Sequence, residues 1–319
     1  MGVDGYMWRL AISTFLIVSC LGAPRAYAEG VALTFDDLPT MALTGDASYA
    51  QLTTKRLLDG LRVHHVPATG FVIAEKLEGD GGVEHTKLVN QWLSAGMVLG
   101  NHTYSHVSLN KTPLDQYIAE VSHADRVLRP LLAARRRPLQ WFRHPYLETG
   151  LTIETRSAFE AWLSAHGYRV APVTMENSDW VFALPYDDAI LRHDAAGAAR
   201  VQRAYLDYTG KVVAWYRTAA LELLGRRPSF VFLLHATRLN ADSLDQLASL
   251  LRRNDLRAIT LDRAMKDPAY RIADAYAGPN GDEWLSRWAV TLHKDLPWKS
   301  FPEPPADIAA EDDRLDTNP

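Results

Sequence analysis

Paired carboxylates and spaced histidines are the residues of this 319-residue chain best suited to chemistry. Asp36 and Asp37 are adjacent, and His102 and His106 stand four positions apart. Histidines at i and i+4 share one face of a helical turn and can present two imidazole nitrogens to one ion. With Asp37 they would supply two nitrogens and one oxygen, which leaves positions open for water and substrate. This donor set suits zinc, with other divalent transition metals as alternatives.

Three later segments carry further polar residues of interest. Arg143 could fix the orientation of a carboxylate and keep it ionised. Trp180, beside Asp179, offers an aromatic ring that could stack on the face of a sugar. His235 ends the apolar run 230–234, where it could be either a satisfied core histidine or a general acid.

Position strengthens these signals, each of which is weak alone. An Asp-Asp pair is usually a solvated turn or a helix cap, and His-x-x-x-His pairs arise often by chance. All five segments, however, directly follow predicted strands. In parallel α/β folds the carboxyl ends of the strands are where sites are built. We therefore expect the five segments to form one site.

Strand-like and helix-like stretches alternate along the chain, which favours parallel strands joined by crossover helices. The alternation predicts an α/β fold with one catalytic domain, first as a (β/α) barrel of seven or eight units, closed or incomplete, and second as an open doubly wound sheet. No Gly-rich phosphate loop follows a strand. The apolar runs predict strands at 31–35, 69–73, 97–100, 141–143, 168–173, 230–234 and 257–261. Helices are expected at 50–63, 87–95, 114–132, 159–166 and 241–253, and over most of 187–224.

Composition excludes several classes of protein. The formal net charge is −4, so no overall basic field points to nucleic acid, and we expect no nucleic-acid partner. Cys20 is the only cysteine. Thiol catalysis and cysteine metal sites are therefore excluded if the chain is cleaved beyond that residue.

The first 28 residues read as an export signal. Arg9 precedes an apolar run that extends to about Leu21, and residues 26–28 supply a small-x-small cleavage pattern. The run is too short to span a bilayer stably, so no transmembrane segment is expected in the mature chain. We expect a periplasmic or extracellular protein. Residues 17–20 also resemble a lipobox, so lipid anchoring at Cys20 is the alternative.

The expected domain organisation has three parts. A signal peptide occupies 1–28, and a catalytic domain occupies 29–298. Residues 299–319 are rich in proline and acidic residues, which predicts a disordered tail.

The five segments, in this order, resemble the motifs of the polysaccharide deacetylase family, the NodB-homology domain of carbohydrate esterase family 4. The resemblance covers roughly residues 30–265 and rests on Thr34–Asp37, His102–His106, Arg143–Tyr146, Asp179–Trp180 and Leu233–His235. It implies a distorted (β/α)7–8 barrel and metal-assisted hydrolysis of N-acetyl or O-acetyl groups on glycans.

The resemblance also implies a role for each matched residue. Asp36 resembles the catalytic base, and Asp37, His102 and His106 resemble the metal ligands. Arg143 and Asp179 resemble a pair that tunes the base. His235 resembles the general acid, and the backbone N–H of Tyr146 resembles the donor to the oxyanion. The walls of the substrate groove and acetyl pocket are expected at Tyr146, Trp180 and Leu233.

Two positions depart from the family pattern. Leu147 stands where the family usually has glycine, and Glu176 stands where it usually has a shorter acid. Both bear on substrate preference more than on the chemistry. The expected function is removal of N-acetyl groups from an amino-sugar polymer, such as peptidoglycan, a chitin oligomer or an exopolysaccharide. An O-acetyl (xylan-type) esterase and a catalytically silent glycan-binding module remain as alternatives.

Overall fold

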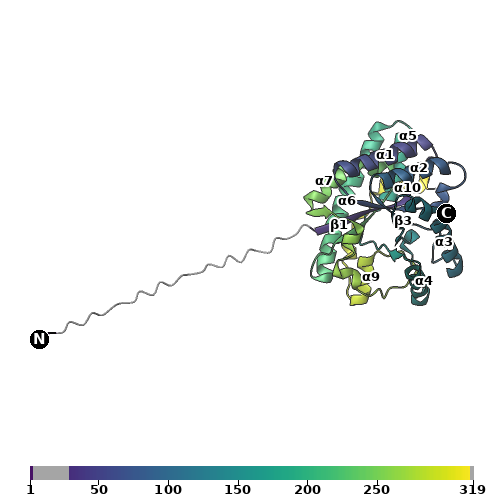
Figure 1. Ribbon diagram of the computed structural model, residues 1–319. Helices are drawn as coiled ribbons and strands as arrows, with labels where there is room; N and C mark the ends of the chain where they lie inside the picture. The colour runs from purple at the N-terminus through teal and green to yellow at the C-terminus, as the bar shows by residue number, and fades with distance from the viewer. Residues whose placement is uncertain (3–28, 317–319) are drawn as a thin grey trace.

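The computed structural model describes residues 1–2 and 29–316 (Figure 1). The predicted signal peptide and Cys20 lie almost entirely in residues 3–28, which are outside the described residues. Across the part of the chain that is described, no helix is long and apolar enough to cross a membrane.

All paired strands run parallel in one sheet, in the order β5-β4-β3-β2-β1-β7-β6, with β8 paired to the start of β1. Within residues 29–316 no pairing joins the edge strands β5 and β6, so the curled sheet is an incomplete barrel. Neighbouring strands follow chain order from β1 to β5, as in a barrel. A doubly wound sheet would reverse direction near its first strand. The prediction of a distorted α/β barrel is confirmed.

The strands are short, and three of them contain only two residues. Their bounds are β1 (Glu29–Leu38), β2 (Ala68–Val72), β3 (Val98–Asn101), β4 (Trp141–Phe142), β5 (Arg169–Val170), β6 (Met175–Glu176), β7 (Phe230–His235) and β8 (Leu256–Ala258). The two longest, β1 and β7, lie side by side and are almost wholly buried. Each has a neighbouring strand on both sides, and their burial is as expected for strands covered on both faces.

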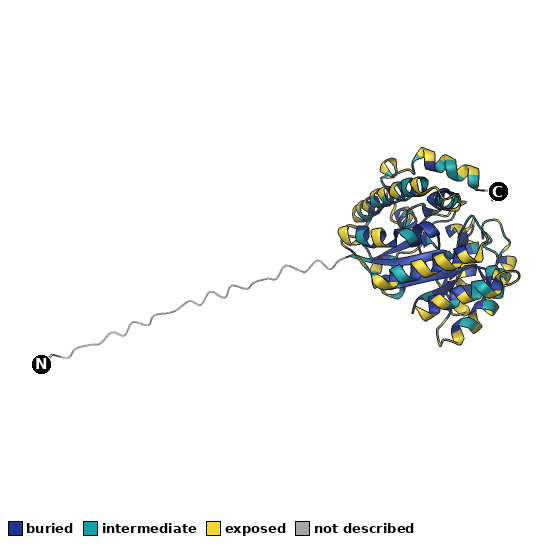
Figure 2. Cartoon of the chain, turned by 90° about the horizontal axis from the view of Figure 1, so that it is seen from above, coloured by how far each residue is buried: buried dark blue, intermediate teal, exposed yellow. Residues whose placement is uncertain are grey.

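Helices surround the sheet, with exposed residues on their outward sides and buried residues facing the strands (Figure 2). Every connection between consecutive strands except that from β5 to β6 contains an α-helix, as in βαβ units. Their bounds are α1 (Ala47–Val63), α2 (Gly82–Ser94), α3 (Leu114–Ala133), α4 (Ile153–Ala165), α5 (Asp179–Leu191), α6 (Ala195–Leu224), α7 (Arg238–Arg253), α8 (Leu261–Ala264), α9 (Trp284–Leu292) and α10 (Ala306–Leu315). Short 3₁₀ turns lie at Ala74–Leu77, Pro145–Leu147, Pro268–Arg271 and Trp298–Ser300.

Helix α7 shows how local sequence sets an element next to the site. The side chain of Thr237 accepts a hydrogen bond from the backbone N–H of Asn240 and so caps the helix immediately after β7. Leu244, Leu247 and Leu251 recur at helical spacing and are buried against the sheet. The cap ends the strand at His235 and fixes where that histidine lies.

The prediction of a disordered tail from residue 299 is wrong for the described residues. Ala306–Leu315 form helix α10, which packs against α5. Ile308 is fully buried, and Arg200 forms ion pairs with Asp307 and Glu311. Proline and acidic residues suggested too little apolar surface for order, but Ile308 buries its side chain and the acidic residues pair with Arg200. Residues 317–319 lie outside the described residues.

Candidate active site

A bulge at the end of β1 orients the two adjacent carboxylates. The register between β1 and β2 shifts between Phe35 and Leu38, and Asp37 has a φ of 65°. A bulge with one left-handed residue redirects the side chains of a strand. Asp36 becomes buried, whereas Asp37 keeps 15% of its side chain exposed.

The structure brings Asp37, His102 and His106 together as a group that can hold a metal ion. Oδ1 of Asp37 lies 3.5 Å from Nε2 of His102 and 3.4 Å from Nε2 of His106. Two ligands about 2.1 Å from a tetrahedral metal would be about 3.4 Å apart. Oδ1 of Asp37 is also buried and has no hydrogen-bond partner. An orphaned carboxylate oxygen between two imidazole nitrogens fits a divalent cation.

The two histidines do not lie on a helical turn, contrary to the prediction. They belong to the loop after β3, where Thr103 and His106 adopt left-handed φ values of 66° and 58°. Nδ1 of His102 lies 2.9 Å from the backbone carbonyl of Arg143. Because a carbonyl can only accept, this nitrogen carries the proton, and Nε2 presents its lone pair to the site.

Arg143 lies beside Asp36, as the sequence suggested. It is fully buried, and its Nη1 lies 3.3 and 3.1 Å from the two carboxylate oxygens of Asp36. Its other nitrogens donate to Oγ1 of Thr34 and to the carbonyl of Ala171. With all three of its nitrogens engaged, the guanidinium holds the carboxylate in one orientation.

Asp179 does not pair with Arg143, which corrects the expectation of a common pair that tunes the base. Its Oδ1 lies 2.7 Å from Nδ1 of His235, and its Oδ2 accepts from the backbone N–H of His235 at 2.7 Å. Asn240 also donates to Asp179. Arg143 therefore binds Asp36, and Asp179 binds His235.

Strand register places the two proton-carrying candidates opposite each other. Asp36 on β1 is paired with His235 on β7. Because Asp179 occupies Nδ1 of the imidazole, only Nε2 of His235 is left to act on a substrate. The carboxylate and the imidazole thus lie on neighbouring strands at the same edge of the sheet, with the candidate metal ligands beside them.

Buried charges shift the protonation of these groups. Burial alone would raise the pKa of Asp37, but the imidazoles of His102 and His106 hold it well below its usual range. Burial, together with the nearby His102, lowers the pKa of His106 to about 4, so its ring is neutral at pH 7. Burial opposes charge on His235 as well, but Asp179 raises the pKa of this histidine to about 9.

The predicted substrate-binding residues surround this centre. Trp180 is 39% exposed, and its ring stands edge-on to the ring of His235 at 5.8 Å. Tyr146 is 59% exposed, and its ring centre lies 4.6 Å from that of His106. Leu233 is nearly buried in a small cluster with Leu147 and Val173. Two aromatic rings therefore face solvent beside the candidate site.

The sequence analysis did not identify Lys76, which binds the backbone carbonyl of Asp37. Its Nζ donates to the carbonyl of Asp37 at 3.1 Å and to that of Thr40 at 3.0 Å. Burial lowers the pKa of Lys76, which Asp37 partly offsets. Lys76 follows β2 as the other site residues follow their strands, so the same positional rule could have identified it. Asn240 was also missed, because nothing in its spacing indicates a bond to Asp179.

The fold and these residues define a class of protein, a parallel α/β domain with a carboxylate and two histidines at the carboxyl edge of its sheet. Residues 25–170 match the family model described as polysaccharide deacetylase. Over these residues the chain is similar to the polysaccharide deacetylase family, which confirms the resemblance found in the sequence.

Two curated relatives illustrate the similarity. A peptidoglycan-N-acetylglucosamine deacetylase of Bacillus cereus is 29% identical over 150 residues, which are 47% of this chain and 46% of that protein. A chitooligosaccharide deacetylase of Sinorhizobium fredii is 31% identical over 170 residues, which are 53% of this chain and 65% of that protein. The chain therefore spans about half of the first relative and just under two thirds of the second.

Solved structures agree on the fold. The Bc1960 peptidoglycan N-acetylglucosamine deacetylase is 23% identical, with a TM-score of 0.50 over 75% of this chain and 89% of that chain. A mutant of BA3943, described as a CE4 family pseudoenzyme with restored enzymatic activity, is 18% identical, with a TM-score of 0.51 over 75% and 68%. Because a pseudoenzyme shares the fold, the fold alone does not determine activity, and the residues of the site carry that argument.

Proposed function

We propose that this protein is a metal-dependent hydrolase that removes N-acetyl groups from a polysaccharide containing N-acetylglucosamine. The convergence of Asp37, His102 and His106 between a carboxylate and a protonated histidine carries the proposal. The relatives named for peptidoglycan and chitooligosaccharide deacetylation support it.

The proposed metal ligands are Asp37, His102 and His106. Zinc suits one carboxylate oxygen and two imidazole nitrogens, with positions left for water and substrate. When bound, the ion supplies Lewis acidity, which polarises the acetyl carbonyl and makes water easier to deprotonate. Lys76 holds Asp37 through its backbone carbonyl, and the carbonyl of Arg143 holds the imidazole of His102.

The remaining residues move protons and stabilise charge. Asp36, held by Arg143, accepts the proton of the attacking water. The backbone N–H of Tyr146 donates to the oxyanion of the tetrahedral intermediate. His235 then donates the proton on Nε2 to the departing amine, which cannot leave as an anion. A pKa of about 9 keeps His235 protonated at neutral pH, and Asp179 is the main reason for that value.

Aromatic residues favour a glycan over a small acetamide. The exposed rings of Trp180 and Tyr146 lie beside His235 and His106 and offer apolar faces for sugar rings. Leu233, with Leu147 and Val173, provides an apolar surface for the acetyl methyl group.

We also propose that the protein is exported. Glu29, the residue after the predicted cleavage position, is the first residue of β1, and its carboxylate forms ion pairs with Arg217 and Arg227. N-terminal sequencing of the exported protein is expected to find Glu29. A lipid-modified Cys20 would support the anchored alternative, and a retained residue 1 would contradict export.

Acetate release tests the function directly. The zinc-loaded protein should release acetate from chitotetraose and from peptidoglycan faster than from acetylated xylan, and a chelator should abolish release. A preference for acetylated xylan would favour the O-acetyl esterase. Binding of chitotetraose without acetate release, with metal bound, would favour the silent glycan-binding module.

A further inference from the structure

Two consecutive non-glycine residues in the loop after β4 have left-handed backbones. Tyr146 has φ 55° and ψ 12°, and Leu147 has φ 55°. Residues other than glycine disfavour this conformation, so surrounding contacts must hold it. This loop carries the backbone N–H of Tyr146, so the same contacts also fix the direction of that N–H.

Arg287 of α9 holds this loop through its guanidinium, which is fully buried. Nη2 donates to the carbonyl of Leu147 at 2.9 Å, and Nη1 donates to Oγ1 of Thr149 at 2.8 Å. Nη1 also lies 3.1 Å from Oδ2 of Asp274, and Nε donates to the carbonyl of Asp282 at 2.7 Å. One rigid side chain thus ties the loop to the segment 274–282.

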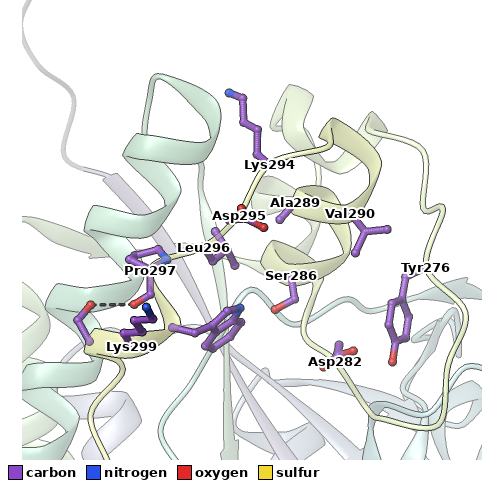
Figure 3. A pocket seen from close by; sticks show the side chains of 12 residues that line it. Tyr276, Asp282, Ser286, Ala289, Val290, Lys294, Asp295, Leu296, Pro297 and Lys299 are labelled. Carbon is purple, nitrogen blue, oxygen red and sulfur yellow. Dashed lines mark hydrogen bonds between the residues drawn. The ribbon is translucent and has the colours of Figure 1, made fainter.

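That segment also contacts the loop through its backbone. A Cβ atom at Gly281 would lie 1.6 Å from the carbonyl oxygen of Tyr146, so only glycine fits there. Asn110 donates to the carbonyls of Gly278 and Pro279 and accepts from the N–H of Gly150. The outward side of the segment, at Tyr276 and Asp282, lines a separate groove of about 880 Å³ (Figure 3).

We propose that Arg287 is a positioning residue for the reaction. It keeps Tyr146 and Leu147 in their left-handed conformations, so that the N–H of Tyr146 stays directed at the developing oxyanion. The proposal rests on the proposed function, because it assigns that N–H to the oxyanion. Arg287 lies outside residues 25–170, so the supporting contact comes from a part of the chain that the family model does not match.

The arrangement also explains how leucine is accommodated at position 147. Glycine would adopt a φ of 55° without cost, whereas leucine needs an external constraint. The Leu147 side chain packs with Val173 and Leu233, and its carbonyl is held by Arg287. The arginine thus allows an apolar side chain at a backbone position that favours glycine.

The first test compares Arg287→Met with Arg156→Met. Arg156 is also buried and binds Asp274 and the carbonyl of Tyr276, but its hydrogen bonds and ion pairs do not involve residues 146–149. Arg287→Met should lower kcat on chitotetraose about 10- to 100-fold, because a misaligned oxyanion donor loses most of its effect, while KM changes less than about threefold. Arg156→Met should change kcat less than about threefold. Equal losses in the two variants would overturn the proposal.

The second test places glycine at position 147, where a left-handed backbone then needs no contact from Arg287 to hold it. Leu147→Gly and Leu147→Ala delete the same contacts and differ mainly in the cost of a left-handed backbone, which is worth roughly tenfold. With Arg287 present, the two variants should have similar kcat. With Arg287→Met, the glycine variant should be roughly tenfold faster than the alanine variant. Equal rates in the Arg287→Met background would contradict a positioning role.

Hydrogen exchange separates failure of this inference from failure of the proposed function. Exchange of the Leu147 and Glu148 amides should accelerate about tenfold or more in Arg287→Met and not in Arg156→Met, whether or not the parent protein releases acetate. An inactive parent would overturn the proposed function, and unchanged exchange would overturn the role of Arg287.

If Arg287→Met does not fold, Gly281→Ala tests the same loop against Gly45→Ala, where a Cβ meets no atom within 4 Å. Gly281→Ala should then lower kcat and Gly45→Ala should not, and equal rates would overturn the proposal.

Discussion

At the scale of single residues, the two groups proposed to transfer protons each have a charged partner of their own. Asp36 depends on Arg143, and His235 depends on Asp179. Neither Asp36 nor His235 belongs to the three candidate metal ligands. Each can therefore be altered without removing a proposed ligand.

The choice of leaving group should separate the two roles. Asp36→Asn and His235→Ala should each slow deacetylation of chitotetraose about 10²–10⁴-fold and leave zinc bound. An activated acetyl ester needs no proton on departure, so it should largely rescue His235→Ala and leave Asp36→Asn slow. Steady-state rates with both substrates, together with metal content, test this. Equal rescue of both variants would show that the roles are misassigned.

Loss of Asp179 should move the alkaline limb of the pH–rate profile to lower pH. Asp179 is the main reason that the pKa of His235 rises to about 9, so Asp179→Asn should lower that pKa. The imidazole would then lose its proton, and with it the acid function, at a lower pH. A profile of kcat between pH 6 and 10 tests this. An unchanged alkaline limb would mean that another group controls it.

At the scale of elements, helix α10 is part of the folded domain. Helix α10 docks on α5 through Ile308, which is fully buried, and through ion pairs from Arg200. The ion pairs are partly exposed and contribute little, so the isoleucine should dominate.

Truncation of this side chain tests the docking. Ile308→Ala should lower the free energy of unfolding by about 2–4 kcal/mol, the usual effect of deleting a buried aliphatic side chain. Leu221→Ala on α6 is the matched control, because Leu221 is 42% exposed and should lose less than about 1 kcal/mol. Denaturant titration gives both values. Similar losses would mean that α10 is not docked in solution.

At the scale of the whole molecule, buried acids make stability depend on pH. Burial raises the pKa of Glu283 to about 7 from an ordinary value of 4.5, and Glu176 adds to the shift. The folded state therefore binds this proton more tightly than the unfolded chain. The resulting stability is fully present below pH 4.5 and is lost as the pH rises through about 7.

A neutral replacement should therefore stabilise the protein only at high pH. Glu283→Gln keeps an oxygen to accept from the N–H of Ser286, but it carries no charge. At pH 8 it should raise the free energy of unfolding by about 1–3 kcal/mol, and at pH 4 it should have little effect. Denaturant titrations at both pH values, with the metal state held constant, measure the difference. A loss of stability at pH 8 would contradict the proposed burial cost.

The sequence by itself determined the elements and the chemical identity of the site. Apolar runs and helical periodicity are local, so they predicted the main strands and helices, although the two-residue strand β6 and the helices α8, α9 and α10 were missed. Polar residues at strand ends predicted the site, because parallel strands bring those ends to one edge. Asp37, His102 and His106 could be chosen because their side chains can bind a metal and because they follow predicted strands.

Only the tertiary structure decided which residues support one another. Asp179 binds His235 rather than Arg143, and Arg287 holds Leu147 from 140 positions away. His102 and His106 converge through a loop and not through a helix. These contacts depend on how distant segments pack and on left-handed backbone conformations that are stable only when packing holds them. Neither can be predicted from residue spacing along the chain.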